Sequence, residues 1–141
     1  MAEFKLVISD PKTGKTLQRE VKDQSAKPFI GLKIGDAIKG EAFDLTGYEF
    51  VITGGSDYCG FPMRKGIQTM RKRIVADAGV GFAGKHRGYD VKDVYRKKTV
   101  CGDGIHDKIS QINLKITKQG KTSLFEEKKE GEAAPAAKKK E

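Results

Sequence analysis

The chain has 141 residues, one domain by size, and a formal net charge of +9. No apolar run approaches the ~18 residues of a membrane-spanning helix, and the N-terminus lacks the apolar segment of a signal peptide. Two cysteines 42 positions apart, without a secretory context, predict a reducing compartment and a cytoplasmic protein. The 17 glycines favour many turns and short strands over long helices.

Alternation of apolar and polar residues predicts the elements of the first half of the chain. The first strand is predicted over residues 4–9, where every second residue is apolar. Turn residues at 10–15 separate it from a second alternating segment at 17–21, so the two should form a hairpin. Residues 28–44 interrupt their apolar residues with three glycines, which favours a loop with one helical turn at most.

The same pattern continues in the second half. Residues 48–52 predict a strand that ends at Gly54-Gly55, and residues 68–76 form another candidate strand. A weaker, charge-rich strand region follows at 91–100, and the last strand is expected over 109–116. Short strands at this spacing predict an all-β, mainly antiparallel fold, a small β-barrel with short helical turns.

The domain boundary is predicted at residue 125. Residues 126–141 consist of Glu, Lys, Ala, Gly and Pro, with no apolar side chain larger than Ala. Such a segment has nothing with which to build a core, so we expect a disordered C-terminal tail. Residues 1–125 are expected to form one β-barrel domain.

Positive charge is concentrated in the middle of the sequence. Residues 51–100 carry 11 basic and 4 acidic side chains, whereas residues 1–50 carry 8 of each. One basic cluster is usually only a solvated face, but four clusters with few acids between them indicate a polyanion, most often nucleic acid. The predicted RNA-binding residues are Arg64, Lys65, Arg71, Lys72, Arg73, Lys85, His86, Arg87, Arg96, Lys97 and Lys98. Tyr58, Phe61, Tyr89 and Tyr95 lie among them and could stack on unpaired bases.

A glycine-rich segment at 79–86 nearly matches a nucleotide-binding P-loop. His86 stands where that motif needs the hydroxyl of Ser or Thr for Mg²⁺, and poor helix sequence follows instead of a helix. We therefore expect a flexible surface loop whose basic side chains could still touch RNA phosphates.

Metal and nucleophile chemistry has little support in the sequence. Cys59, His86, Cys101 and His106 could be zinc ligands, but no pair among them has the close spacing of structural zinc sites. A nucleophilic Cys59 would need a histidine within hydrogen-bond reach. The residues around Asp103 are typical of a turn. No metal, cofactor or catalytic residue is predicted.

A second glycine-rich segment, residues 54–66, is predicted to be an ordered structural device. Its motif residues are Gly54, Gly55, Asp57, Gly60, Phe61, Pro62, Met63 and Gly66. Glycine is favoured there if the chain needs a positive φ or a close approach of the backbone. We expect Phe61 to fold back onto the core, Pro62 to fix the turn, and Arg64-Lys65 to point outward to phosphate.

The motif at 54–66 resembles the G-G-x-D-x-x-G-F-P-M-x-x-G signature of the ribosomal protein S6e family, found in the small subunit of archaeal and eukaryotic ribosomes. Further stretches agree in order, such as 4–14, 96–102 and 112–120, so the resemblance covers about residues 3–121. It implies a β-barrel-like domain bound to small-subunit ribosomal RNA. The long basic C-terminal helix of the eukaryotic members has no counterpart here, so the resemblance is to the short archaeal form.

Taken together, these features predict a non-enzymatic structural constituent of the small ribosomal subunit. Its expected partners are small-subunit ribosomal RNA and neighbouring ribosomal proteins, with no membrane and no small-molecule substrate. Two alternatives stay open: an extraribosomal RNA-binding or translation factor with a similar barrel, and a small enzyme that binds phosphate through residues 79–86.

Overall fold

The computed structural model of the chain describes residues 3–86, 89–90, 94–120 and 124, and these residues are mostly β. The strands are β1 (Glu3–Ser9), β2 (Thr16–Lys22), β3 (Ala37–Lys39), β4 (Glu49–Asp57), β5 (Arg71–Ala76), β6 (Lys85–His86), β7 (Tyr89–Asp90), β8 (Arg96–Cys101) and β9 (Ile109–Lys118). Short 3-10 turns occur at η1 (Asp23–Ser25), η2 (Lys27–Phe29) and η3 (Gly40–Phe43). Among the described residues, no helix has the length and apolar character to cross a bilayer.

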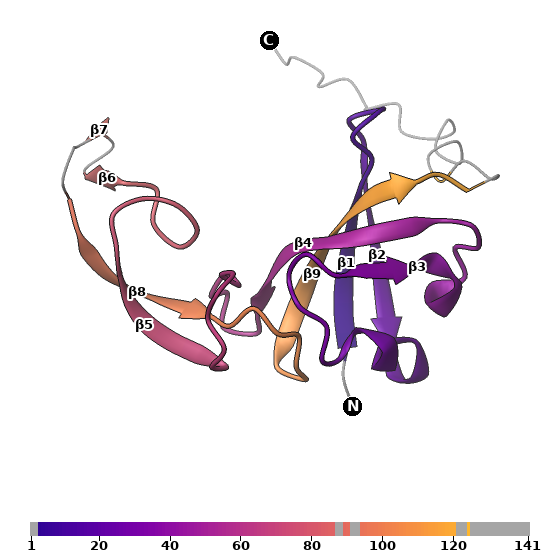
Figure 1. The fold of residues 1–141 in the computed structure, drawn as a ribbon, viewed down its shortest axis with the longest axis horizontal. Coiled ribbons are helices and arrows are strands. Elements are labelled where there is room, and N and C mark those ends of the chain that lie inside the picture. Colours follow the sequence, from indigo (N-terminus) through magenta and orange to yellow (C-terminus); the bar gives the residue numbers. More distant parts are fainter. Residues whose placement is uncertain (1–2, 87–88, 91–93, 121–123, 125–141) are drawn as a thin grey trace, which may run out of the picture.

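Five strands form the body of the molecule, a mixed sheet in the order β2-β1-β9-β4-β3 (Figure 1). β1 and β2 pair antiparallel, which confirms the predicted hairpin. β9 lies in the centre of the sheet, parallel to β1 and antiparallel to β4. The first and the last strands of the chain are therefore neighbours.

The core lies on one face of this sheet. Leu6 is opposite Ile112 and Ile52 is opposite Leu114, and all four side chains are fully buried. Opposed residues share a face, so the alternation seen in the sequence becomes one continuous apolar layer. A row of aromatic rings covers this layer: Phe4, Phe29, Phe43 and Phe50, with successive ring centroids 6.3, 5.5 and 5.3 Å apart. Each such buried ring stabilises the fold by roughly 2–3 kcal/mol.

β5 and β8 form a separate two-stranded antiparallel ribbon, called the ribbon below. Figure 1 shows it projecting from the side of the body, with the short β6–β7 pair beyond its far end. The charge-rich segments at 68–76 and 91–100 were predicted as strands, and within the described residues both predictions are confirmed.

The structure confirms the β class of the fold. In the described residues β2 and β3 are the two edges of an open sheet, so the closed barrel stays a prediction. Three local expectations were wrong. Residues 28–44 are not a loop with one helical turn at most, because they contain the end of η2, strand β3 paired with β4, and η3. β4 does not end at Gly54-Gly55 but runs through both glycines to Asp57, and the predicted loop at 79–86 ends in strand β6. The predicted tail at 126–141 lies outside the described residues.

The motif at 54–66 joins the body to the ribbon. The Met63 N–H donates to the Gly55 carbonyl in β4 at 2.9 Å, and the Cys101 N–H in β8 donates to the Pro62 carbonyl at 2.9 Å. Residues 62–64 thus run between the central sheet and the ribbon. A tight turn brings them there: the Gly60 N–H donates to the Asp57 carbonyl at 2.9 Å, and Gly60 has a φ of +81°, which favours glycine.

The two adjacent glycines of β4 allow a matched test of this joint. A Cβ on Gly55 would overlap the Gln111 carbonyl oxygen and lie 3.0 Å from Met63 Sδ, whereas a Cβ on Gly54 would meet nothing within 4 Å. We expect Gly55→Ala to destabilise the fold by about 2 kcal/mol, through overpacking of backbone on backbone. Gly54→Ala should change the free energy of unfolding by less than about 0.5 kcal/mol. Chemical denaturation of both variants measures the difference, and equal losses would contradict a specific close approach at Gly55.

Candidate nucleic-acid interface

The root of the ribbon is fixed by an ion pair between Asp57 and Arg71. The Arg71 guanidinium donates to the Asp57 carboxylate through Nε at 3.0 Å and through Nη2, and the Cys59 N–H donates to the other carboxylate oxygen. The side chain of Asp57 is 2% exposed. Burial alone would raise the pKa of Asp57, but the bonds from Arg71 and Cys59 outweigh it and the net pKa is lowered. Asp57 therefore remains ionised and holds the first residue of β5.

Two aromatic rings enclose the same guanidinium. Arg71 Cζ lies 4.8 Å from the ring centroid of Phe61 and 5.5 Å from that of Tyr58. Phe61 is half-buried and lies outside the core cluster, so the expectation that it folds back onto the core was wrong. Met63, at 2% exposure, is the core residue of the motif. Arg71 is thus held by the protein itself, and its predicted contact with RNA stays a prediction.

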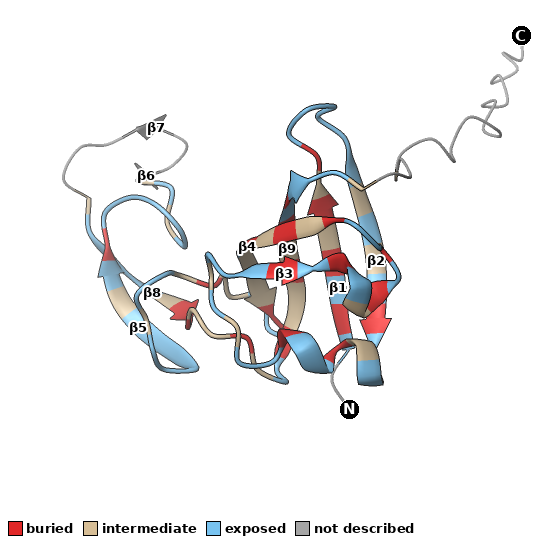
Figure 2. Cartoon of the chain, turned by 45° about the vertical axis from the view of Figure 1, so that its right-hand side comes forward, coloured by how far each residue is buried: buried red, intermediate tan, exposed pale blue. Residues whose placement is uncertain are grey.

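The register of the ribbon distributes the remaining basic residues over its two faces. Arg73 is opposite Thr99 and Val75 is opposite Lys97, which puts Arg73, Val75 and Lys97 on one face. All three side chains are exposed, and Figure 2 shows most of β5 in the colour of exposed residues. Alternation along a strand separates Arg73 from Lys72, but which residues of β8 share each face depends on the register with the partner strand.

The other face of the ribbon carries Lys72 and Lys98 and is partly covered by the protein. Val100 is fully buried on this face, and a Cβ on Gly81 would meet its Cγ1 at 2.8 Å, so the glycine-rich segment packs there. Lys98 Nζ lies 5.6 Å from the Phe82 ring centroid. The residues that resembled a P-loop therefore serve, in part, as a cover for the ribbon.

Neutralisation of charge differs between the body and the ribbon. Of the five ion pairs between described residues, four lie in the body: Lys5–Glu20, Arg19–Asp44, Lys22–Glu3 and Lys118–Glu49. The fifth holds Arg71 at the root of the ribbon. In the described part of the chain, no carboxylate lies within 4.0 Å of the cationic groups of Lys72, Arg73 or Lys97. The outer ribbon thus presents positive charge to the solvent.

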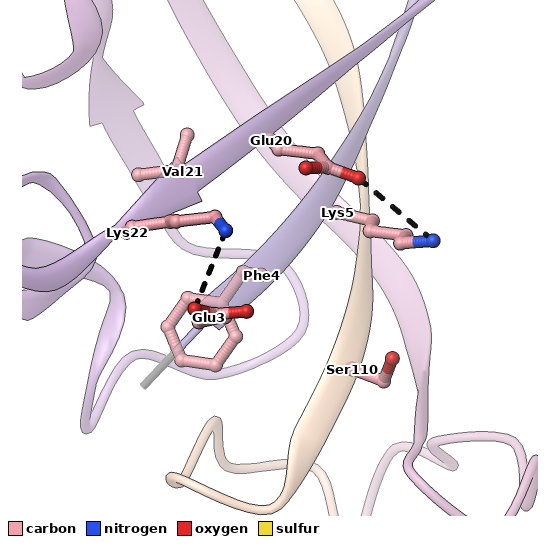
Figure 3. A pocket seen from close by; sticks show the side chains of 7 residues that line it. All are labelled: Glu3, Phe4, Lys5, Glu20, Val21, Lys22 and Ser110. Atoms are coloured by element: carbon pink, nitrogen blue, oxygen red, sulfur yellow. Dashed lines mark ion pairs between the residues drawn. The ribbon is translucent and has the colours of Figure 1, made fainter. Parts of the chain in front are cut away.

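A small hollow on the body shows the contrast (Figure 3). It has a volume of about 110 Å³ and is lined by β1, β2 and Ser110 of β9. Across it, Lys5 Nζ lies 3.9 Å from Glu20 and Lys22 Nζ lies 3.4 Å from Glu3. Because each lysine faces a glutamate, this hollow has little net charge with which to hold an anion.

The other predicted binding residues lie around the ribbon. Arg64 Nη1 donates to the Val80 carbonyl at 3.1 Å, which ties the motif to the segment covering the ribbon, and Lys65 next to it is exposed. Arg96 is exposed at the start of β8. Lys85 and His86 form β6, which pairs with β7, and Arg87 lies outside the described residues.

Two of the candidate zinc residues, Cys101 and His106, have structural contacts. The Cys101 thiol donates to the Met70 carbonyl at 3.1 Å, His106 Nε2 lies 3.8 Å from Cys101 Sγ, and the Lys108 N–H donates to His106 Nδ1 at 3.2 Å. Burial raises the pKa of Cys101, which opposes formation of a thiolate. Within the described ranges, no three His, Cys, Asp or Glu side chains gather as metal ligands. These contacts fix the loop after β8 against the ribbon.

The ion pair of Arg71 was not predicted from the sequence. Arg71 was grouped with Lys72 and Arg73 because the three are consecutive, whereas the carboxylate that binds Arg71 is 14 positions away. One signal was available, because Asp57 is the single acidic residue of the motif at 54–66. An isolated carboxylate in a basic, glycine-rich segment indicates an internal ion pair.

Comparison with known proteins adds an independent observation. A family model described as "Ribosomal protein S6e" matches residues 4–128. The "Small ribosomal subunit protein eS6" of Thermoplasma acidophilum is 45% identical over 129 residues, which cover 91% of this chain and 98% of that protein. The proteins of the same name in Methanocella arvoryzae and Archaeoglobus fulgidus are 42% and 44% identical, covering 98% and 88% of this chain and 100% and 94% of their own. The family match includes both the body and the ribbon, and the chain belongs to the ribosomal protein S6e family.

Proposed function

We propose that the chain is a structural constituent of the small ribosomal subunit, on the ribosome in the cytoplasm, and that its ribbon binds small-subunit ribosomal RNA. One observation carries the RNA-binding part: Lys72, Arg73 and Lys97 are exposed on the projecting ribbon, and among the described residues no carboxylate lies within 4.0 Å of their cationic groups. Exposed cations on a projecting element match the charge of an RNA backbone. The names of the archaeal relatives support the ribosomal assignment.

The proposed mechanism is neutralisation and positioning without chemical catalysis. Lys72 and Lys98 on one face, with Arg73 and Lys97 on the other, can contact phosphates of two RNA segments that run along the ribbon. Each contact releases condensed counterions, which drives binding. The ion pair of Asp57 with Arg71 fixes the root of the ribbon, so little freedom is lost when RNA binds.

Further parts of the proposal concern the domain and its partners. Residues 1–125 act as one RNA-binding domain, and the sheet of the body curves in the manner of a small barrel. Neighbouring ribosomal proteins contact the edge of the body near β1 and β2, where Lys5 and Lys22 are paired with glutamates and the surface is less attractive to phosphate.

Co-sedimentation tests this function against the alternative of an extraribosomal factor. Small subunits purified from cells and washed in salt that removes translation factors should retain one copy of the chain per subunit. A protein embedded among RNA helices makes many contacts at once and dissociates slowly. Quantitative mass spectrometry of the washed subunits measures the stoichiometry. Recovery far below one copy, with the chain in the wash, would favour the extraribosomal factor.

A further inference from the structure

Two open hollows adjoin at the root of the ribbon, on the side where β5 meets the loop after β8. The first, of about 190 Å³, is lined by Asp57, Tyr58, Met70, Arg71, His106 and Lys108. The second, of about 420 Å³, continues from Met70 and His106 toward Lys33. Because they share two residues, they form one cleft between the ribbon and the body, called the root cleft below.

The walls of the root cleft combine flat and apolar groups with positive charge. Tyr58 and Met70 are 63% and 52% exposed, so both present apolar surface at the cleft. The planar guanidinium of Arg71, the ring of His106 and the ammonium group of Lys108 also line the first hollow, together with Asp57. The second hollow has one ammonium group, from Lys33, and one carboxylate, from Asp103.

Two polar side chains of the first hollow, Asp57 and His106, have partners within the protein. The Asp57 carboxylate is taken by Arg71 and the Cys59 N–H, and Nδ1 of His106 accepts from the Lys108 N–H. Nε2 of His106 lies at 3.8 Å from Cys101 Sγ. Both nitrogens of the imidazole thus lie near groups of the protein, and the first hollow offers the exposed ring of Tyr58 beside positive charge.

We propose that the root cleft binds one unstacked nucleobase of an RNA strand whose phosphates lie on the ribbon. Stacking on Tyr58 and packing on Met70 use the planar, apolar face that every base has, and the lysines meet the phosphates on either side. The inference rests on the proposed RNA binding of the ribbon and names a second mode of contact, through a base, at a defined place.

The test compares two short RNA oligonucleotides of equal length, an oligouridylate and an abasic ribose-phosphate strand. Both carry the same phosphates, so the difference in Kd isolates the base. The full chain should bind the base-bearing strand about tenfold more tightly, as expected for one stacked base. Tyr58→Ala should abolish this preference and leave the affinity for the abasic strand unchanged, which also shows that the variant is folded. Tyr58→Phe keeps the ring and should keep the preference.

Tyr95 supplies the matched control. It is also 63% exposed but lies outside the root cleft, at the start of the outer ribbon. Tyr95→Ala should retain the tenfold preference, and equal loss in the Tyr95 and Tyr58 variants would overturn the inference. Arg73→Gln with Lys97→Gln should weaken both strands by the same factor. Equal binding of both strands by the unchanged chain would refute the base site while leaving phosphate binding by the ribbon intact. If neither strand binds, the proposed function itself fails.

Discussion

Replacing Lys72, Arg73 and Lys97 together with Gln should lower RNA affinity about 500-fold at 0.1 M salt. Each phosphate contact strengthens binding by a factor of about 10 to the power 0.9 for every tenfold decrease in salt concentration. Between 1 M and 0.1 M salt, three contacts therefore contribute nearly three factors of ten in affinity, and this contribution is lost when they are removed. The three side chains are exposed and have no carboxylate partner among the described residues, so their removal should disturb the fold little. Titration of a small-subunit RNA fragment at several salt concentrations gives both the affinity and its salt dependence.

The body provides a control with the same change in charge. Lys5, Lys22 and Lys118 each face a glutamate, and replacing all three with Gln should weaken RNA binding by less than about tenfold. With about six phosphates neutralised, the unchanged chain and this control should lose roughly 10³-fold in affinity from 50 to 200 mM salt. The ribbon variant should lose only about 40-fold over that range. Equal effects of the two triple variants would mean that net charge, not the ribbon, determines binding.

Asp57→Ala should destabilise the fold by about 3 kcal/mol. The substitution removes the carboxylate that accepts hydrogen bonds from the partly enclosed guanidinium of Arg71 and from the Cys59 N–H. For a domain of this size the thermal midpoint should fall by about 10 °C. Glu20→Ala removes a carboxylate from an exposed cross-strand pair at 3.9 Å and should cost less than about 0.5 kcal/mol. Thermal unfolding compares the two variants, and similar midpoints would contradict a structural role for Asp57.

The stability that the Asp57 carboxylate contributes should depend on pH. The pKa of Asp57 lies below its ordinary value of 3.8 in the folded state, so the ionised group contributes stability at every pH above that value. This contribution should decline as the pH falls below about 4 and vanish below the lowered folded pKa. The stability difference between the unchanged chain and Asp57→Asn should therefore be constant from pH 7 to pH 5 and shrink toward pH 2. A difference that grows on acidification would show that the folded-state pKa is raised instead.

Local pattern was sufficient to predict most strands of the body. Phe4, Leu6 and Ile8 alternate because one face of β1 is buried, and the same holds for β9. The extent of β4 was misjudged because Gly54-Gly55 is typical of a turn, whereas Gly55 is needed for close contact with β9 and Met63. β3 has only three residues, too few for a periodic pattern.

The binding region was more predictable than the roles of its residues. Charge density along the sequence located β5 and β8, because clustered cations are visible without any knowledge of the fold. Which cation is free depends on contacts between distant segments, such as Arg71 with Asp57, and no local pattern encodes them. The burial of Met63 in place of Phe61 has the same origin, because the turn at 57–60 and contacts with distant strands decide which of the two apolar side chains is buried.

The place of β9 in the sheet has a consequence for synthesis of the chain. Lys5 of β1 pairs with Gln111 of β9, so this edge of β1 has no partner strand until more than one hundred further residues have been translated. Until then β1–β2 and β3–β4 are two separate hairpins with an uncovered apolar face, and hairpins of this size are marginal in water. The body should therefore fold late and in one cooperative step, with the slow kinetics of non-local pairing. A chain terminated before Ile109 would contain both strands of the basic ribbon but would lack the strand that joins β1 to β4 in the body.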